Sequence, residues 1–398
     1  MNIAIFADNF YPQINGVVTA IANLSDGLAK RGHRVLVIAP KYRKATLPKL
    51  HPNIELITVR SIPSLFYHDI KFTNIINRKI YKALKKNNIE ILHFHAPLTL
   101  AFQAIMFAKL MKLPLVGTFH TFFAESDYLK HAKLDYKFVQ KLSWKYNNMY
   151  YNRCNLVTSP SESTRKILMG HRYRKPIKVI SNGINPKIFD NSGAAAIKNK
   201  YNPDGPICLF VGRIAHEKNI EFLIRAFDRV VKKVSNAKLL IVGWGPQFKD
   251  IQATVKELKL ENQVVLLGAI PHDELIASGI YGASDLFVTA SKTENQSVTL
   301  LEAQINGLPC VVADAKGNPD LITNNKNGLL IKPNSLEEFS EGMIKLLQNP
   351  KLLQKFRRET LEMIKKHHIE RVIDEWEKTY HKLIKENLKN RKKPAKKR

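Results

Sequence analysis

The sequence has few cysteines, and those present are not placed for shared chemistry. Its three cysteines, Cys154, Cys208 and Cys310, are far apart and form no CxxC pair. Each lies in or beside an apolar segment, which favours buried free thiols over metal ligands or a nucleophile. This usage indicates a reducing compartment.

Long apolar runs are also missing. No stretch approaches the roughly 18 consecutive apolar residues that a helix needs to span a bilayer. The apolar run at the N-terminus, Asn2–Ala7, has strand length and lacks the basic and long apolar regions of a secretion signal. We therefore expect a cytoplasmic protein.

Acidic residues are scarce: 34 stand against 63 basic ones, a net charge of +29. Residues 1–178 hold 28 basic and 9 acidic residues, and the tail 389–398 adds 7 positive charges, which leaves +3 for residues 179–388. This asymmetry indicates a polyanionic partner, either membrane phospholipid or nucleic acid. A generally lysine-rich proteome is the alternative. No RNA-binding aromatic signature, helix-turn-helix or zinc spacing is present, so no nucleic acid is expected as a partner.

Short continuous apolar runs alternate with helical patterns along the whole chain. Such runs are typical of parallel strands covered on both faces, and the alternation predicts an α/β fold. At 398 residues the chain is long enough for two such domains. The predicted strands are Asn2–Ala7, Arg34–Ala39, Ile54–Val59, Glu90–His95, Leu115–Phe119, Leu156–Ser159 and Lys178–Ile180, then Ile207–Val211, Leu239–Val242, Val264–Leu267, Leu286–Thr289, Cys310–Ala313 and Leu329–Ile331. Helices are predicted between them, among others at Val17–Lys30, Ile75–Lys86 and Leu98–Met111.

Turn residues are dense between 182 and 205, which places the domain boundary there. We expect a first domain at 1–181 and a second domain at 182–365. A C-terminal helix at 366–388, with Trp376 and Tyr380 on one face, is expected to pack back on the first domain. The basic tail at 389–398 is expected to be disordered.

Ligands of open parallel sheets bind outside the carboxyl ends of the strands, so these segments are where a site is expected. Gly16 opens a helix after the first strand and would let a phosphate approach, although one glycine is weak support. His95 and His120 each close a strand. No carboxylate or cysteine at ligand spacing joins them, so no metal site is expected. We interpret His120 as a hydrogen-bonding group in the cleft and His95 as structural.

The second half holds the stronger candidates. Arg213 and Lys218 flank a glycine turn after the strand Ile207–Val211, and two cations beside a helix start suit a diphosphate. Glu294 lies in a loop and Glu302 inside the following helix, for which Ser297 is a fair N-cap. A carboxylate at that place can accept hydrogen bonds from ribose hydroxyls.

At these residues the sequence resembles retaining glycosyltransferases of family 4, which have the GT-B architecture of two doubly wound Rossmann-like domains facing a central cleft. The resemblance covers nearly the whole chain, and it implies that residues 1–181 form the N-terminal acceptor and membrane-facing domain and residues 182–365 the nucleotide-sugar domain. Its elements are the Glu-x7-Glu motif from Glu294 to Glu302, the segments Gly212–Asn219 and Asn182–Ile184, and the initial Pro12–Thr19.

The resemblance implies a role for each matching residue. Arg213 and Lys218, next to Gly212, would hold the diphosphate, and Glu302 the ribose hydroxyls. Glu294 would reach the donor sugar, and the amides of Gln296, Ser297 and Val298 would contact sugar or phosphate. Gly16 would approach the phosphate from the other domain, and His120 would lie near the primary hydroxyl of the sugar. The catalytic set is therefore His120, Glu294, Arg213 and Lys218, with no metal and no other cofactor.

Three loops depart from the family pattern: Asn185, Trp244 and Asn295–Ser297 replace its usual residues. Because these loops are implied to touch sugar and base, they leave the donor sugar open.

The segment Thr118–Phe123, followed by Tyr128 and Leu129, is similar to that of diacylglycerol glucosyltransferases.

The segment from Lys137 to Tyr150 forms an amphipathic helical pattern in the first half. Phe138, Leu142 and Met149 share a face with Val139, Tyr146 and Tyr150, while Lys137, Lys141 and Lys145 repeat beside it. This pattern suits docking on an anionic membrane surface, and an ordinary core face is the alternative. We expect a protein peripherally associated with the inner face of the cell membrane.

The sequence therefore predicts transfer of a hexose, with glucose from UDP-glucose as the first candidate, to a membrane lipid such as diacylglycerol. Another UDP- or GDP-hexose with a soluble glycan or isoprenoid-linked acceptor is the alternative. A nucleotide-sugar epimerase on the same architecture is a further one, and it would need no acceptor.

Overall fold

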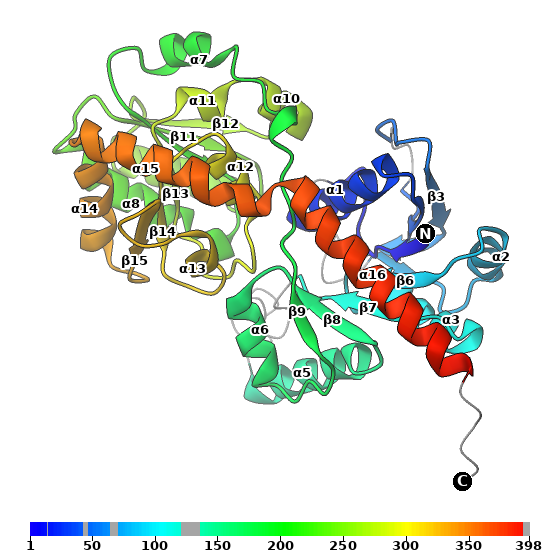
Figure 1. Cartoon of the computed structure of the whole chain (residues 1–398). Helices are drawn as coiled ribbons and strands as arrows, with labels where there is room; N and C mark the ends of the chain where they lie inside the picture. Colours follow the sequence, from blue (N-terminus) through cyan, green and yellow to red (C-terminus); the bar gives the residue numbers. More distant parts are fainter. Residues whose placement is uncertain (14, 43–46, 64–70, 121–135, 393–398) are drawn as a thin grey trace. The chain divides into compact units, whose positions relative to one another are not determined.

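The computed structural model describes residues 1–13, 15–42, 47–63, 71–120 and 136–392. The chain divides into two compact units (Figure 1). Unit 1 comprises Met1–Gly183 and Ile369–Arg398, and unit 2 comprises Ile184–His368. The C-terminal helix thus belongs to the same unit as the N-terminus.

Unit 1 is built on a parallel sheet with the strand order β3-β2-β1-β6-β7-β8-β9. Its strands are β1 (Asn2–Phe6), β2 (Arg34–Pro40), β3 (Ile54–Val59), β6 (Ile91–Phe94), β7 (Leu115–Thr118), β8 (Leu156–Ser159) and β9 (Ile177–Val179). Successive side chains of β1 enter different cores: Ala4 and Phe6 pack on one face of the sheet, and Ile3 and Ile5 on the other. Both faces are covered, which is why most residues of these strands are apolar.

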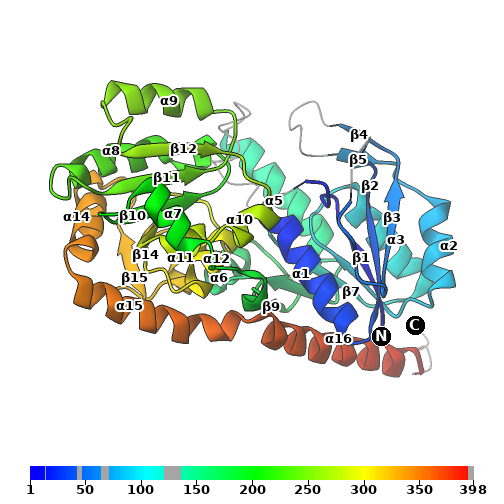
Figure 2. The ribbon, with the colours of Figure 1, turned by 90° about the horizontal axis from the view of Figure 1, so that it is seen from above.

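Helices cover both faces of this sheet. One core takes side chains from α2 (Arg78–Lys86), α3 (Thr99–Met111), α5 (Lys137–Tyr151) and α6 (Glu162–Met169). The other takes them from α1 (Gly16–Lys30) and α16 (Ile369–Lys392), which lie side by side (Figure 2). Unit 1 also contains a small antiparallel pair, β4 (Ser61–Pro63) and β5 (Lys71–Thr73).

Unit 2 repeats the plan with the strand order β12-β11-β10-β13-β14-β15, again parallel. Its strands are β10 (Ile207–Val211), β11 (Lys238–Val242), β12 (Val264–Gly268), β13 (Leu286–Thr289), β14 (Cys310–Ala313) and β15 (Gly328–Ile331). One core takes side chains from α8 (Ile220–Val231), α9 (Phe248–Glu257), α14 (Leu336–Leu347) and α15 (Pro350–Met363). The opposite core takes them from α7 (Ala194–Tyr201), α10 (His272–Ala277), α11 (Ile280–Ala283), α12 (Val298–Ile305) and α13 (Asn318–Leu321). Three 3-10 turns, η1 (Pro186–Ile188), η2 (His216–Lys218) and η3 (Ile364–His367), connect elements of this unit.

The predicted α/β class and the parallel sheets are confirmed, and every predicted strand occurs within one or two residues of its expected ends. Trp376 and Tyr380 lie on one buried face of α16, with ring centroids 5.2 Å apart, as predicted. The three cysteines are buried free thiols, and burial raises the pKa of each.

Two predicted helices have different boundaries in the structure. Helix α2 begins at Arg78 rather than Ile75, because the side chain of Asn77 accepts a hydrogen bond from the backbone N–H of Lys79 and caps the helix there. Helix α16 begins at Ile369 rather than at 366, because Ile364–His367 form the 3-10 turn η3, and it continues to Lys392, so residues 389–392 are helical and not a disordered tail. Arg391 donates to the carbonyls of Met111 and Lys112, which attaches this last turn to unit 1.

Candidate active site

The strand order places a topological switch point in each unit. The order reverses between β1 and β6 in unit 1 and between β10 and β13 in unit 2. In open α/β sheets, ligands bind outside the carboxyl ends of the strands at such points. The segments that follow these four strands are therefore where each unit can bind a ligand.

In unit 2, β10 is followed by Gly212 and Arg213, and Arg213 is exposed. The turn after β11 lies in close contact with this segment. A Cβ on Gly243, whose φ is +146°, would lie 1.8 Å from the carbonyl oxygen of Gly212, so only glycine fits at position 243. The backbone N–H of Gly212 donates to the carbonyl of Val242 at 3.0 Å. The backbone that carries Arg213 is therefore held in place by β11 and the turn that follows it.

Lys218, the last residue of η2, forms an ion pair with Glu294 from the loop after β13. The two side chains are 23% and 14% exposed. Burial raises the pKa of Glu294, but the positive charge of Lys218 and hydrogen bonds from Lys218 and Ser291 outweigh it, and the pKa is lowered. Glu294 is therefore a carboxylate at neutral pH. The pair joins the loops of the two strands that flank the switch point.

The loop that carries Glu294 is held in place by the loop after β14. The backbone N–H of Gly317 donates to the carbonyl of Glu294 at 2.9 Å, and a Cβ on Gly317 would lie 1.4 Å from the carbonyl oxygen of Asn295. Only glycine allows this approach. The position of Glu294 thus depends on the next loop along the sheet edge as well as on its own strand.

Helix α12 follows this loop. Ser297 is its N-cap, as predicted, and its hydroxyl accepts a hydrogen bond from the backbone N–H of Leu300 at 3.3 Å. Gln296, Ser297 and Val298 are all buried around the start of the helix. One of the N–H groups at the helix start is therefore already used by the Ser297 hydroxyl.

Glu302, inside α12, is only 1% exposed and has a partner on each carboxylate oxygen. The hydroxyl of Tyr281 donates to Oε2 at 2.7 Å, and Nε2 of His272 lies 2.7 Å from Oε1. Burial lowers the pKa of His272, but the hydrogen bond and charge of Glu302 outweigh it, so its pKa is raised. Sequence reasoning missed both partners. His272 follows the carboxyl end of β12 and could have been found by its position, whereas nothing in the sequence signals Tyr281.

In unit 1, His95 and His120 follow β6 and β7 and are in contact. Nδ1 of His95 lies 2.8 Å from Nε2 of His120, and the rings stack with centroids 5.1 Å apart. His93 extends this column, since its ring lies 4.1 Å from that of His95, and its Nδ1 lies 2.7 Å from the hydroxyl of Tyr380 on α16. His95, expected to be structural, is thus the direct partner of His120.

Asp8, just after β1, is a site residue that sequence reasoning did not single out. It is 1% exposed and accepts hydrogen bonds from the backbone N–H groups of Leu100 at 2.9 Å and Ala101 at 3.4 Å, and from the Thr99 hydroxyl at 3.3 Å. It therefore binds the start of α3. Burial outweighs these bonds and raises its pKa to about 7.

Gly16 is the first residue of α1, as predicted, and is exposed. The side chain of Asn15 caps this helix and accepts from the backbone N–H groups of Val17 and Val18, both at 3.0 Å. A phosphate at this helix start would have to share those N–H groups with Asn15.

Helix α5 has two different faces. Lys137, Lys141 and Lys145 are exposed, as are Phe138 at 74% and Leu142 at 54%. Its other side is core: Tyr150 is buried, which corrects the prediction that it shares a face with Phe138. Of the segment similar to diacylglycerol glucosyltransferases, residues from Thr121 to Leu129 lie outside the described residues.

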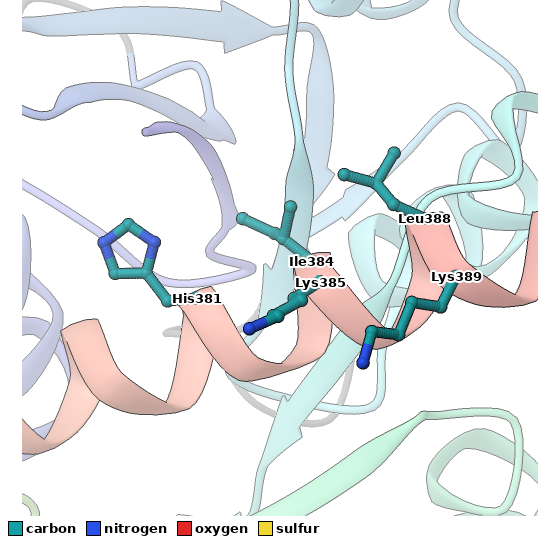
Figure 3. Close-up of a pocket in the computed structure, with 5 residues that line it drawn as sticks. All are labelled: His381, Ile384, Lys385, Leu388 and Lys389. Carbon is teal, nitrogen blue, oxygen red and sulfur yellow. The ribbon is translucent and has the colours of Figure 1, made fainter.

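A shallow pocket lies along α16 in unit 1 (Figure 3). It is lined by His381, Ile384, Lys385, Leu388 and Lys389. Asn387 in the same stretch donates to the carbonyl of Lys112, which comes just before the amino end of β7. The pocket is thus at the opposite end of the sheet from His120 and does not belong to the candidate site.

Within the described ranges, no group of three or more His, Cys, Asp or Glu side chains could hold a metal ion, and no helix is long and apolar enough to cross a bilayer.

Comparison with known proteins agrees with this architecture. Residues 14–188 match the family model described as Glycosyltransferase Family 4, and residues 194–363 match Glycosyl transferases group 1. The chain is 29% identical to alpha-monoglucosyldiacylglycerol synthase of Acholeplasma laidlawii, over 89% of this chain and 90% of that protein. It is 28% identical to GDP-mannose-dependent alpha-mannosyltransferase of Corynebacterium glutamicum, over 83% of this chain and 76% of that protein.

Solved structures show the same fold. The sucrose-phosphate synthase from Thermosynechococcus elongatus superposes with a TM-score of 0.80 at 19% identity, covering 97% of this chain and 99% of that one. Anabaena HepE, solved in complex with UDP, gives 0.76 at 18% identity, covering 96% of this chain and 100% of that one.

The fold and the two matched domains define a glycosyltransferase of the GT-B class. The chain belongs to the glycosyltransferases that join a family 4 domain to a group 1 domain, and it is a nucleotide-sugar-dependent enzyme.

Proposed function

We propose that this enzyme transfers a hexose to the hydroxyl of a membrane lipid with retention of anomeric configuration. Glucose from UDP-glucose is the first candidate donor, and diacylglycerol is the first candidate acceptor. The main support for a donor-binding site is the Lys218–Glu294 ion pair at the switch point of unit 2, with the exposed Arg213 on the same loop as Lys218. The acceptor is supported by two relatives that are named alpha-monoglucosyldiacylglycerol synthases.

Arg213 and Lys218 would bind the diphosphate in this proposal. The ammonium group of Lys218 has three N–H donors, so it can keep Glu294 on one of them and bind phosphate oxygens with the others. As the bond to the sugar breaks, negative charge grows on the leaving diphosphate, and two positioned cations stabilise it. The basic pair thereby supplies what a divalent cation would, and we propose that the enzyme needs no metal.

The two glutamates would bind the two sugars of the donor. Each oxygen of Glu302 accepts one hydrogen bond, from Tyr281 or His272. A carboxylate oxygen has two acceptor sites, so one site on each oxygen remains for the vicinal hydroxyls of ribose. Glu294 would accept from a hydroxyl of the hexose, and the amides at Gln296–Val298 would donate to sugar or phosphate.

The reaction needs no separate base in this proposal. The bond between the anomeric carbon and the diphosphate oxygen breaks, and a bond from the same carbon to the acceptor oxygen forms on the same face. The proton of the acceptor hydroxyl passes to the leaving diphosphate oxygen. In unit 1, Gly16 would contact the donor phosphate and His120 the primary hydroxyl of the sugar.

Membrane association is part of the proposal. The exposed Phe138 and Leu142 of α5, with three exposed lysines on the same helix, would dock on anionic lipid at the inner face of the cell membrane.

A different donor is the second candidate, because relatives also include GDP-mannose-dependent mannosyltransferases. Trp244, which differs from the family pattern, is 59% exposed beside the diphosphate loop, and its carbonyl accepts from the N–H of Ile214 at 3.1 Å. A large side chain there can change which base or sugar fits. With such a donor, a soluble glycan or an isoprenoid-linked lipid is the alternative acceptor.

The test is a panel of UDP- and GDP-hexoses with diacylglycerol, extracted membrane lipids and soluble glycans, with and without EDTA. Products are identified by mass spectrometry and their anomeric configuration by NMR. We expect an α-hexosyl lipid that still forms in EDTA. Transfer to soluble glycans alone would contradict the lipid acceptor, and conversion of the nucleotide sugar without any acceptor would indicate an epimerase.

A further inference from the structure

A hydrogen bond joins the imidazoles of His95 and His120, and its proton can be covalently attached to either of the two ring nitrogens. Nδ1 of His95 and Nε2 of His120 are 2.8 Å apart, so one nitrogen donates and the other accepts. Burial and the neighbouring imidazoles of His93 and His120 lower the pKa of His95, and burial lowers the pKa of His120 to about 4. Both rings are therefore neutral at pH 7, and each carries a single N–H.

The surroundings of His95 decide between the two arrangements. Its other nitrogen, Nε2, is buried and has no hydrogen-bond partner among the described residues. If His120 donated, the proton of His95 would sit on Nε2 as a buried N–H without an acceptor. If His95 donates from Nδ1, Nε2 is left only with a lone pair. Buried N–H groups without acceptors are rarer in proteins than acceptors that lack a donor, so the second arrangement is favoured.

The tautomer of His120 follows from this choice. Its Nε2 accepts the bond from His95, so its own proton lies on Nδ1, on the other side of the ring. The rings of His95 and His120 also stack, with centroids 5.1 Å apart, which holds the plane of the His120 ring. His120 is thus held in one orientation as a hydrogen-bond donor at Nδ1.

We propose that His95 is a positioning residue that locks His120 in the Nδ1–H tautomer, so that His120 donates to a hydroxyl oxygen of the donor sugar. The contact with the sugar rests on the proposed function, whereas the tautomer does not. The lock orients the hydroxyl that His120 binds and so acts on turnover more than on binding of the nucleotide.

The first experiment tests the tautomer without substrate. Long-range ¹H–¹⁵N NMR spectra of the full chain labelled with [¹⁵N]histidine distinguish a protonated Nδ1 from a protonated Nε2. The signals of His120 are assigned by their loss in His120→Gln. We expect Nδ1–H in the native protein and Nε2–H, which a free imidazole side chain favours, in His95→Phe. A native His120 protonated on Nε2, or one unchanged in His95→Phe, would overturn the proposal.

The second experiment measures turnover with the donor and acceptor that the panel identifies. His95→Phe keeps a ring in the column but removes the hydrogen bond, and kcat should fall about 5- to 10-fold, with KM for the nucleotide sugar within about twofold. His95→Asn places an amide close to the position of Nδ1 and should restore most of kcat and the native tautomer. Failure of His95→Asn to restore either one would contradict the hydrogen-bond role.

His93→Asn is the matched control. His93 lies on the same strand and is equally buried, but it bonds to Tyr380 and Thr118 rather than to His120. This variant should lose thermal stability and keep both the tautomer of His120 and kcat. A change of tautomer in His93→Asn would show a general disturbance of the sheet edge and count against His95. Absence of any sugar transfer by the native chain would refute the proposed function and leave the NMR result standing on its own.

Discussion

Lys218 and Glu294 lie 76 positions apart in the sequence and form an ion pair at the carboxyl edge of unit 2. The pair connects the loop after β10 with the loop after β13, the strands between which the order of the sheet reverses. Because each partner is mostly buried, neither charge is well solvated without the other. In the proposed donor site, the ion pair thus holds the Lys218 cation in place for a diphosphate.

The first prediction concerns Lys218. Lys218→Ala removes a charge-assisted contact to the diphosphate worth about 1.5–3 kcal/mol, so kcat/KM should fall roughly 10- to 150-fold. Steady-state kinetics with the identified donor check this. Lys232→Ala is the control, because Lys232 also pairs with an acidic residue but is 68% exposed at the C-cap of α8, and its kinetics should stay native. Native kinetics in a folded Lys218→Ala enzyme would contradict the assignment.

The second prediction concerns the two hydrogen bonds on Glu302. Tyr281→Phe removes the O–H that donates to Oε2 and leaves the buried carboxylate with a single partner. The side chain is then less firmly oriented towards ribose, and KM for the nucleotide sugar should rise about 5- to 50-fold with little change in kcat. Isothermal titration with UDP or GDP gives the same loss as a binding constant.

Tyr173→Phe is the control for Tyr281→Phe. The Tyr173 hydroxyl is buried and has no hydrogen-bond partner in the part of the chain that the structure describes, so its removal should leave nucleotide binding as it is. His272→Gln tests the other oxygen. Equal nucleotide affinity in Tyr281→Phe, His272→Gln and the native enzyme would show that Glu302 does not bind the nucleotide.

The fold was predictable because its signals are local. A strand such as β10 is buried on both faces and reads as the unbroken apolar run Ile207–Val211, and Ser297 marks the start of α12 by its capping chemistry. Likewise, Gly212 and Glu294 could be placed near the site because they follow strands. Their position required only the rule that ligands bind at carboxyl ends.

The contacts within the site were not predictable because they join distant parts of the chain. The bond between His95 and His120 crosses from β6 to β7, and the bond from Tyr281 to Glu302 joins two helices. Neither pair has a sequence spacing that implies contact. The buried Asp8 was missed for the same reason, since its partners begin at Thr99, 91 positions away.

The third prediction is a pH dependence that comes from Asp8. Its pKa is raised to about 7 in the folded protein from the ordinary 3.8, so the folded state binds this proton more tightly than the unfolded state. The contribution of Asp8 to the free energy of unfolding should therefore fall as the pH rises from about 4 to about 7 and then level off. Relative to the native protein, Asp8→Asn should become more stable by on the order of 2 kcal/mol between pH 5 and pH 8.

Urea unfolding followed by tryptophan fluorescence measures this difference. In a Trp244→Phe background, the remaining tryptophans, Trp144 and Trp376, are both in unit 1, so the signal reports the unit that holds Asp8. Asp26→Asn, an exposed carboxylate paired with Lys30, controls for the loss of one charge. If the stability difference between Asp8→Asn and the native protein is the same at all pH values, Asp8 is not a proton-binding group of the folded state.

The fourth prediction separates charge from apolar contact in membrane docking by α5. Replacing Lys137, Lys141 and Lys145 with glutamine removes about 1 kcal/mol of attraction per lysine, so binding to phosphatidylglycerol vesicles should weaken roughly 100-fold at low salt and lose most of its salt dependence. The double variant Phe138→Ser, Leu142→Ser removes apolar side chains that are 74% and 54% exposed. It should weaken binding at every salt concentration, because burial of apolar surface is not screened.

Met169→Ser, 59% exposed on α6, is the control and should bind as the native protein does. Vesicle sedimentation measures all three, and native binding by both α5 variants would mean that another surface of the chain contacts the lipid.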